Sequence, residues 1–230
     1  MKEEVLFYGL LQRQWCIGLT WQGWLLLLAL LAGLGLWLGR GLYPFLAENR
    51  DVSRCEAMVV EGWMPDQAVA RIVAEYQRRG CQRLFFTGGP IELGGPLLEF
   101  GSYAEVGARR AVHYGVPAAA VQAVPAAYAA RDRTYTSALA LRQWLEAQEG
   151  AQEGARLRGL QVMSFGPHAR RTRLLFALAL GEAYEVGVTA LPPLDYPPES
   201  WWRFSGGVRA VIGEGIAFLY ARWLFRPEQA

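Results

Sequence analysis

The sequence predicts an α/β fold, a Rossmann-like three-layer sandwich with a mainly parallel sheet, preceded by one N-terminal transmembrane helix. Two patterns carry this prediction. An apolar run without charged side chains lies near the start of the chain, and short apolar runs alternate with amphipathic segments through the rest, as in sheets covered by helices. We therefore expect a membrane anchor and linker at residues 1–50 and an α/β domain at residues 51–230.

The apolar run extends from Trp15 to Leu38 and is closed by Arg13 and Arg40. A helix of this length measures about 36 Å, enough to cross a bilayer core of about 30 Å with some tilt. The run is longer than the core of a usual signal peptide and has no clear small-residue cleavage site, so we expect a retained single span. Lys and Arg occur on both sides of the span, and their number does not decide its orientation.

Five strands alternate with helices after the anchor. The strands are predicted at residues 57–61, 83–87, 120–124, 160–164 and 184–188, and the helices at 65–79, 102–114, 134–147, directly after 164, and 201–224. Gly and Pro mark several of the boundaries. Ligands of open α/β sheets bind beyond the carboxyl ends of the strands. The residues that follow these strands, together with residues 131–134, are therefore the expected site.

The first turns of the helix after residue 164 carry charges of the unfavourable sign. His168, Arg170, Arg171 and Arg173 lie in its first turns, where the helix dipole favours anions. We expect a negative partner, which is either a neighbouring carboxylate or a bound anion held by the backbone N–H groups of residues 166–169. At about 100° per residue, His168 and Arg171 share one face, whereas Arg170 and Arg173 point away and are expected to be solvated.

The turn at Gly88 and Gly89 has two interpretations, a phosphate-binding turn or a plain strand-to-loop turn. It lacks the spacing of a dinucleotide-binding motif and the ending of a P-loop. The three cysteines are not spaced as metal ligands and no spacing of acidic residues requires a cation, so we predict no metal site. A net charge of +2 argues against a nucleic-acid partner. The sequence does not identify a cofactor.

Cys55 and Cys81 precede Gly62 and Gly88 by the same seven residues, at the starts of the first two strands. If those strands are neighbours in register, about 4.8 Å apart, the two Cα atoms fall near disulfide range. Two ordinary buried thiols are the alternative. A bridge would favour the oxidising outer side of the membrane over the cytoplasm.

Three features in this order resemble a known family. They are Glu105 ten residues before Gly115-Val116-Pro117, the segment Arg133-Thr134-Tyr135, and His168-Ala169-Arg170-Arg171 in an H-x-x-R position. Together they resemble the YdcF/SanA/ElyC family over residues 57–224. The resemblance implies a Rossmann-like domain, often with an N-terminal anchor, that acts in biogenesis of the bacterial envelope. The site residues it implies are Gly88, Gly89, Glu105, Thr134, His168 and Arg171.

The chain departs from the family pattern at two places. The family often has N-T-x-E-N where this chain has Arg133-Thr134-Tyr135-Thr136-Ser137, and a glycine pair where this chain has Glu61-Gly62. Arginine and hydroxyl groups in place of amides and a carboxylate make the pocket more cationic. The resemblance therefore does not define the substrate.

The first functional hypothesis is a bacterial inner-membrane protein whose periplasmic domain binds, or acts on, a phosphorylated small molecule that is lipid-linked or nucleotide-like. Arg133 and Arg171 suit phosphate geometry. We expect His168 to be a general acid or a cationic contact, and Glu105 to orient an arginine or act as a base. The alternative is a non-catalytic anchored subunit that docks on another membrane protein through Trp201-Trp202 and the apolar residues 210–225.

Overall fold

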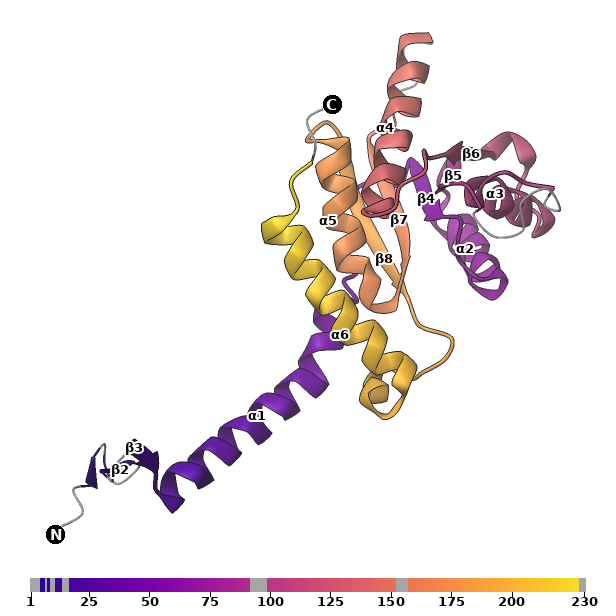
Figure 1. Ribbon diagram of the computed structural model, residues 1–230. Helices are drawn as coiled ribbons and strands as arrows, with labels where there is room; N and C mark the ends of the chain where they lie inside the picture. The colour runs from indigo at the N-terminus through magenta and orange to yellow at the C-terminus, as the bar shows by residue number, and fades with distance from the viewer. Residues whose placement is uncertain are drawn as a thin grey trace. The chain divides into compact units, whose positions relative to one another are not determined.

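The computed structural model describes residues 5–6, 8, 11–13, 17–91, 99–151 and 157–227, drawn in Figure 1. The chain forms two compact units, Met1–Leu42 and Tyr43–Ala230. The predicted boundary at residue 50 lies within the second unit.

The first unit holds three short antiparallel strands and most of a long helix. The strands are β1 (Val5–Leu6), β2 (Leu11–Arg13) and β3 (Ile17–Leu19), paired in that order. Helix α1 (Trp21–Leu46) has 26 residues and is long and apolar enough to span a membrane. The last residues of α1, from Tyr43, belong to the second unit.

The predicted N-terminal apolar helix is present, but its predicted bounds, Trp15 and Leu38, are wrong where the structure describes them. The hydroxyl of Thr20 accepts a hydrogen bond from the N–H of Gly23 at 3.2 Å, which caps the helix and sets its start at Trp21. Residues 15 and 16 lie outside the described residues. The helix continues past Arg40. A charged residue ends an apolar run, but it does not end a helix, because arginine is a good helix former.

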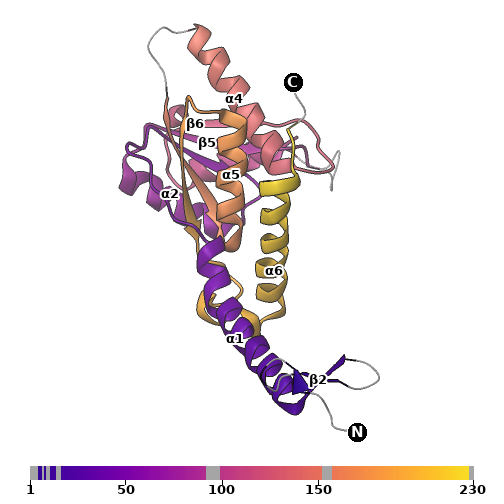
Figure 2. The ribbon, with the colours of Figure 1, turned by 90° about the vertical axis from the view of Figure 1, so that its left-hand side faces the viewer.

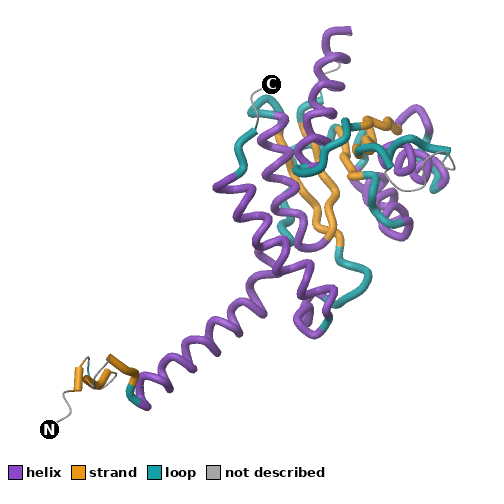
Figure 3. The backbone as a smooth tube through the Cα atoms, in the orientation of Figure 1, coloured by secondary structure: helices purple, strands orange, loops and turns teal. Residues whose placement is uncertain are grey.

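The second unit is an α/β domain with a five-stranded, entirely parallel sheet, which confirms the predicted fold class. Figure 3 shows the strands of this sheet in orange between purple helices. In sheet order the strands are β6 (Val121–Pro125), β5 (Arg83–Gly88), β4 (Ala57–Glu61), β7 (Gly159–Phe165) and β8 (Glu185–Leu191). Each lies within a few residues of its predicted position. Residues 92–98, which follow β5, lie outside the described residues.

Helices cover both faces of the sheet. Helices α2 (Asp66–Arg79) and α3 (Tyr103–His113) pack on one face, and α4 (Arg133–Ala151) and α5 (Ala169–Leu180) on the other. The strands alternate between the two cores: Met58 and Val60 of β4 face α2, whereas Val59 faces the core that includes α4 and α5. This alternation is the period of two expected for a strand buried on both sides.

The strand order places a topological switch point between β4 and β7. From β4 the chain winds outward through β5 to β6, then returns to the other side of β4 and continues through β7 to β8. Connections diverge at such a point and leave a crevice beyond the carboxyl ends of the two central strands. Glu61 ends β4, and the turn η3 (Gly166–His168) follows β7 at this crevice.

Cys55 and Cys81 form a disulfide with a Cα–Cα distance of 5.1 Å. The register of β4 and β5 pairs Ala57 with Arg83, so each cysteine lies two residues before a paired position. Of the two alternatives, a bridge or two buried thiols, the structure therefore shows the bridge. Since both cysteines precede their strands, the bridge links the amino ends of β4 and β5, away from the carboxyl ends where the crevice lies.

The C-terminal segment is not the single helix predicted over residues 201–224. It contains the 3-10 segment η4 (Pro198–Arg203), helix α6 (Ser205–Leu219) and the π-helical turn η5 (Tyr220–Leu224). Phe204 is extended between η4 and α6, which interrupts the helix. Helix α6 lies beside α5 (Figure 2) and brings one face towards the crevice.

Candidate functional site

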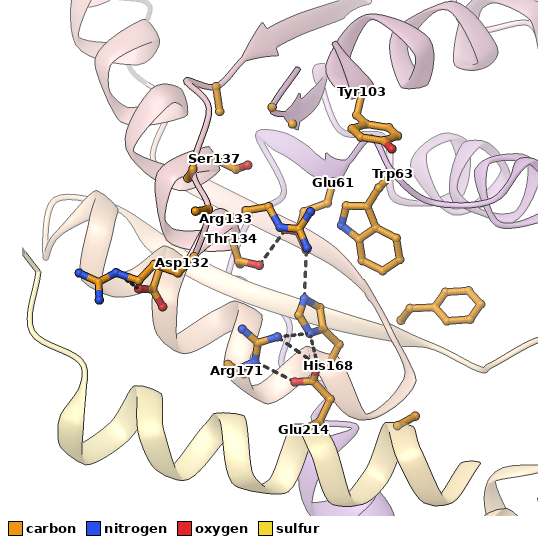
Figure 4. A pocket seen from close by; sticks show the side chains of 18 of the residues that line it. Glu61, Trp63, Tyr103, Asp132, Arg133, Thr134, Ser137, His168, Arg171 and Glu214 are labelled. Carbon is orange, nitrogen blue, oxygen red and sulfur yellow. Dashed lines mark hydrogen bonds and ion pairs between the residues drawn. The ribbon is translucent and has the colours of Figure 1, made fainter. Parts of the chain in front are cut away.

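A cavity of about 730 Å³ opens at the switch point of the sheet (Figure 4). Six of the seven site residues predicted from sequence line it: Gly88, Gly89, Arg133, Thr134, His168 and Arg171. They come from the ends of β5 and β7 and from the starts of α4 and α5. The parallel sheet therefore brings together residues that lie far apart in the sequence.

Glu61 is held at the floor of this cavity with only 4% of its side chain exposed. The hydroxyl of Thr134 donates a hydrogen bond to its Oε1 at 2.9 Å. The next residue must be glycine, because a Cβ on Gly62 would lie 2.1 Å from the carbonyl oxygen of Tyr103. This close approach lets the start of α3 pack directly against the end of β4.

His168 lies between two carboxylates. Gly166 turns the chain after β7 with a φ of +48°, a conformation that glycine adopts freely. The imidazole Nδ1 then lies 2.9 Å from Oε1 of Glu214, and Nε2 lies 3.3 Å from Oε2 of Glu61. Among the described residues, neither Nε2 nor Oε2 has a hydrogen-bond partner, so the two atoms form an ion pair without hydrogen-bond alignment.

Arg171 binds the same carboxylate as His168. Its Nε donates to Oε2 of Glu214 at 2.8 Å and its Nη2 donates to Oε1 at 3.0 Å. This two-point contact fixes Glu214, which α6 contributes from the far side of the cavity (Figure 4). The cluster of Glu61, His168, Arg171 and Glu214 is called the carboxylate–histidine cluster below.

The cluster holds His168 in its charged form. Burial acts to lower the pKa of this imidazole, but Glu214 and Glu61 outweigh it and raise the pKa to about 9. Burial likewise acts to raise the pKa of Glu214, but His168 and Arg171 lower it to about 2. Ion pairing with His168 and the hydrogen bond from Thr134 lower the pKa of Glu61 despite its burial. At neutral pH the cluster therefore contains two carboxylates and two cations.

We expect an NMR titration of His168 to show proton loss near pH 9 instead of near the ordinary value of about 6.5. The chain has two histidines, so His113→Gln leaves His168 as the only imidazole. Because the folded pKa lies above the unfolded one, the imidazolium stabilises the fold fully below about pH 6.5, and this contribution disappears as the pH rises through about 9. A titration midpoint at or below 6.5 would contradict the charged cluster.

The negative partner of the arginine-rich helix start is a set of protein carboxylates. Glu214 neutralises Arg171, and Glu48 contacts Arg173 at 3.0 Å and Arg170 at 3.8 Å. The expectation that Arg170 and Arg173 are solvated is therefore wrong. Residues after α1 pass beside α5 and supply Glu48, which no local sequence pattern indicates.

Glu105 is not in the cavity and does not contact Arg133 or Arg171. Its carboxylate accepts hydrogen bonds from the N–H groups of Gly101 and Ser102 at 2.9 Å, while its own N–H donates to the Ser102 hydroxyl. This is a capping box at the start of α3. The carboxylate that contacts and orients Arg171 is that of Glu214, not that of Glu105.

Arg133 is the cation of the cavity that the protein leaves unpaired. Its side chain is exposed, and no hydrogen bond or ion pair joins it to another residue in the part of the chain that the structure describes. It follows Asp132, which has a φ of 56°, a left-handed conformation that few residues other than glycine and Asn or Asp adopt. The turn before α4 thus directs Arg133 to the rim.

Aromatic side chains form part of the cavity wall. Trp63 is 45% exposed, and its ring lies edge-on to His168 with a centroid distance of 6.0 Å. Tyr103, Tyr128 and Tyr196 also line the cavity. The wall therefore offers flat apolar surfaces beside the charged cluster, as ligand cavities commonly do.

Sequence reasoning placed Glu61 at this edge of the sheet and considered it only as a possible cation ligand, and it missed Glu214. Glu214 is the single acidic residue between Trp201 and Arg226. A lone carboxylate in an apolar helix is a recognisable signal, since acidic side chains are rarely buried without a partner. Among the described residues, no group of three or more His, Cys, Asp or Glu side chains is arranged to hold a metal ion.

Fold and site define an α/β domain with a charged histidine cluster at the switch point of a parallel sheet. Searches against models of protein families, curated proteins and solved structures found no significant match.

Proposed function

We propose that this chain is a single-span protein of the bacterial inner membrane, and that its periplasmic α/β domain binds a phosphate-bearing ligand in the cavity. The ligand is lipid-linked or nucleotide-like, and the protein acts in envelope biogenesis. The proposal rests on the unpaired Arg133 at the rim and on the buried Nε2 of His168, which has no hydrogen-bond partner among the described residues.

The membrane location is supported by α1, whose length and composition suit a span. The side of the membrane is supported by the disulfide between Cys55 and Cys81, since structural disulfides persist in oxidising compartments. The resemblance to the YdcF/SanA/ElyC family supports the link to the bacterial envelope.

The preference for phosphate is supported by the donors that face the cavity. The guanidinium of Arg133 has the planar fork that binds phosphate oxygens at two points. Arg171 is already held by Glu214, so its role is to orient the cluster. The turn at Gly88 and Gly89 lines the same cavity.

The chemistry we propose centres on His168. A protonated imidazole whose Nδ1 is fixed by a carboxylate presents Nε2 as a hydrogen-bond donor or general acid. Nε2 can donate a proton to an oxygen of the ligand, and Glu61 at 3.3 Å stabilises the charged imidazolium before transfer. The arrangement suits protonation of a leaving oxygen, and water is the nucleophile in a hydrolytic reaction of this kind.

Binding of phosphate-bearing compounds to the full chain tests the proposal. We expect Arg133→Ala to weaken binding by about 1.5–3 kcal/mol, as for the loss of a charge-assisted hydrogen bond. Calorimetry in nanodiscs with a nucleotide, a sugar phosphate and an isoprenoid phosphate measures the effect. Arg71→Ala is the matched control, because Arg71 is also an exposed arginine but lies on α2, outside the cavity.

Two results would overturn the proposal. One is that no phosphate-bearing compound binds more tightly than its dephosphorylated analogue. The other is an equal loss of affinity in the Arg133 and Arg71 variants. This would mean that the arginines attract the ligand only through the overall positive charge of the domain, and not through a contact in the cavity.

A further inference from the structure

A stripe of exposed apolar side chains runs along the outer face of α6 and η5. Its members recur at intervals of three and four residues and are between 39% and 69% exposed: Val208, Ile212, Ile216, Leu219 and Trp223. This spacing keeps them on one side of the helix. The opposite side is also apolar, with Gly207, Val211 and Ala221 buried against the domain. A helix that is apolar on both sides is expected to be covered on both.

Cations flank the stripe, and Glu214 is the one acidic residue between Arg203 and Arg226. Arg203, Arg209, Arg222 and Arg226 are exposed, and none of them has a hydrogen bond or ion pair with another described residue. The one acidic residue of this segment, Glu214, points into the cavity, where His168 and Arg171 bind it. The outer face is therefore apolar and positively charged, the combination found in helices that lie on anionic membranes.

The tryptophan of this face suits the same environment. Trp223 is 69% exposed. Tryptophan is enriched at the level of lipid headgroups, where its ring is partly apolar and its N–H is hydrated. The face combines an apolar stripe, tryptophan and arginine.

The last turn of α1 belongs to the same unit as α6. Phe45 in this turn packs against Phe218 of α6 with a centroid distance of 5.6 Å. The outer face of α6 is therefore part of a unit that begins directly after the candidate span.

We propose that the outer face of α6 and η5 is a second membrane contact of this protein, seated on an anionic bilayer surface. A second copy of the chain is the poorer occupant, because two such faces would bring unpaired arginines together without an acid between them. Anionic headgroups instead neutralise these arginines. This contact would hold the domain against the membrane, and it does not depend on what the cavity binds.

The test uses an environment-sensitive fluorophore on a single cysteine of the full chain. Cys55 and Cys81 are bridged, so Cys16→Ser leaves an introduced cysteine as the only free thiol. The probe position is Ile216→Cys, which is 66% exposed. The control is Gln77→Cys, an exposed position on α2. Both proteins are reconstituted in vesicles that contain phosphatidylglycerol, and in vesicles of phosphatidylcholine alone.

We expect the emission of the fluorophore at residue 216 to shift to the blue in anionic vesicles. We also expect lipids that carry a shallow spin label to quench it several-fold more than they quench the fluorophore at residue 77. Phosphatidylcholine vesicles or high salt should reduce the difference, because they remove or screen the charge. Equal quenching at the two positions would overturn the proposal. A blue shift without lipid quenching that grows with protein density would also overturn it, in favour of a second copy.

Discussion

Glu214→Gln will lower the free energy of unfolding by about 3–5 kcal/mol, because it leaves the mostly buried Arg171 guanidinium without its carboxylate. The side chains of Glu214 and Arg171 are 21% and 19% exposed, so water replaces little of the lost interaction. Glutamine keeps the shape of the side chain, which separates the loss of charge from the loss of packing. Thermal or urea unfolding of the full chain in nanodiscs measures the change.

The same variant will lower the pKa of His168 from about 9 towards its ordinary value, since Glu214 is one of the two carboxylates that raise it. Glu146→Gln is the matched control. Glu146 also pairs with an arginine, Arg142 at 2.7 Å, but both side chains are about half exposed, and such pairs contribute at most about 1 kcal/mol. Similar losses in the two variants, or an unchanged pKa of His168, would contradict the proposed cluster.

Replacing both Cys55 and Cys81 by serine will cost about 3.5 kcal/mol in stability, the chain-entropy value for a loop of this size. The two cysteines are 26 residues apart and tie the start of β4 to the start of β5. Without the bridge, the unfolded chain gains conformations while the parallel pairing of the strands stays the same. Unfolding of the full chain, with and without reductant, measures the effect.

Reductant provides the internal control for the disulfide prediction. It should destabilise the native chain by a similar amount and should not affect the serine variant. Mass mapping of unreduced protein that finds both thiols free would disprove the bridge. It would also remove the support that the bridge lends to a periplasmic domain.

The positions of the strands and helices of the α/β domain could be predicted from the sequence because they depend on local patterns. A run such as 57–61 is apolar at every position except its last, as expected for a strand buried on both faces. The capping role of Glu105 was readable in the same way, since Ser102-Tyr103-Ala104-Glu105 matches the capping-box pattern. The pattern was present, but the resemblance led instead to a catalytic or orienting role.

The sequence by itself determined the fold class, the apolar helix at the N-terminus and the clustering of Gly88, Gly89, Thr134 and His168 near one edge of the sheet. Only the tertiary structure decided which carboxylates bind the arginines. Glu214 lies 43 residues from Arg171, and Glu48 lies 125 residues from Arg173. Their pairing depends on how α6 and the segment after α1 pack beside α5, because burial makes an opposite charge necessary without specifying which element supplies it.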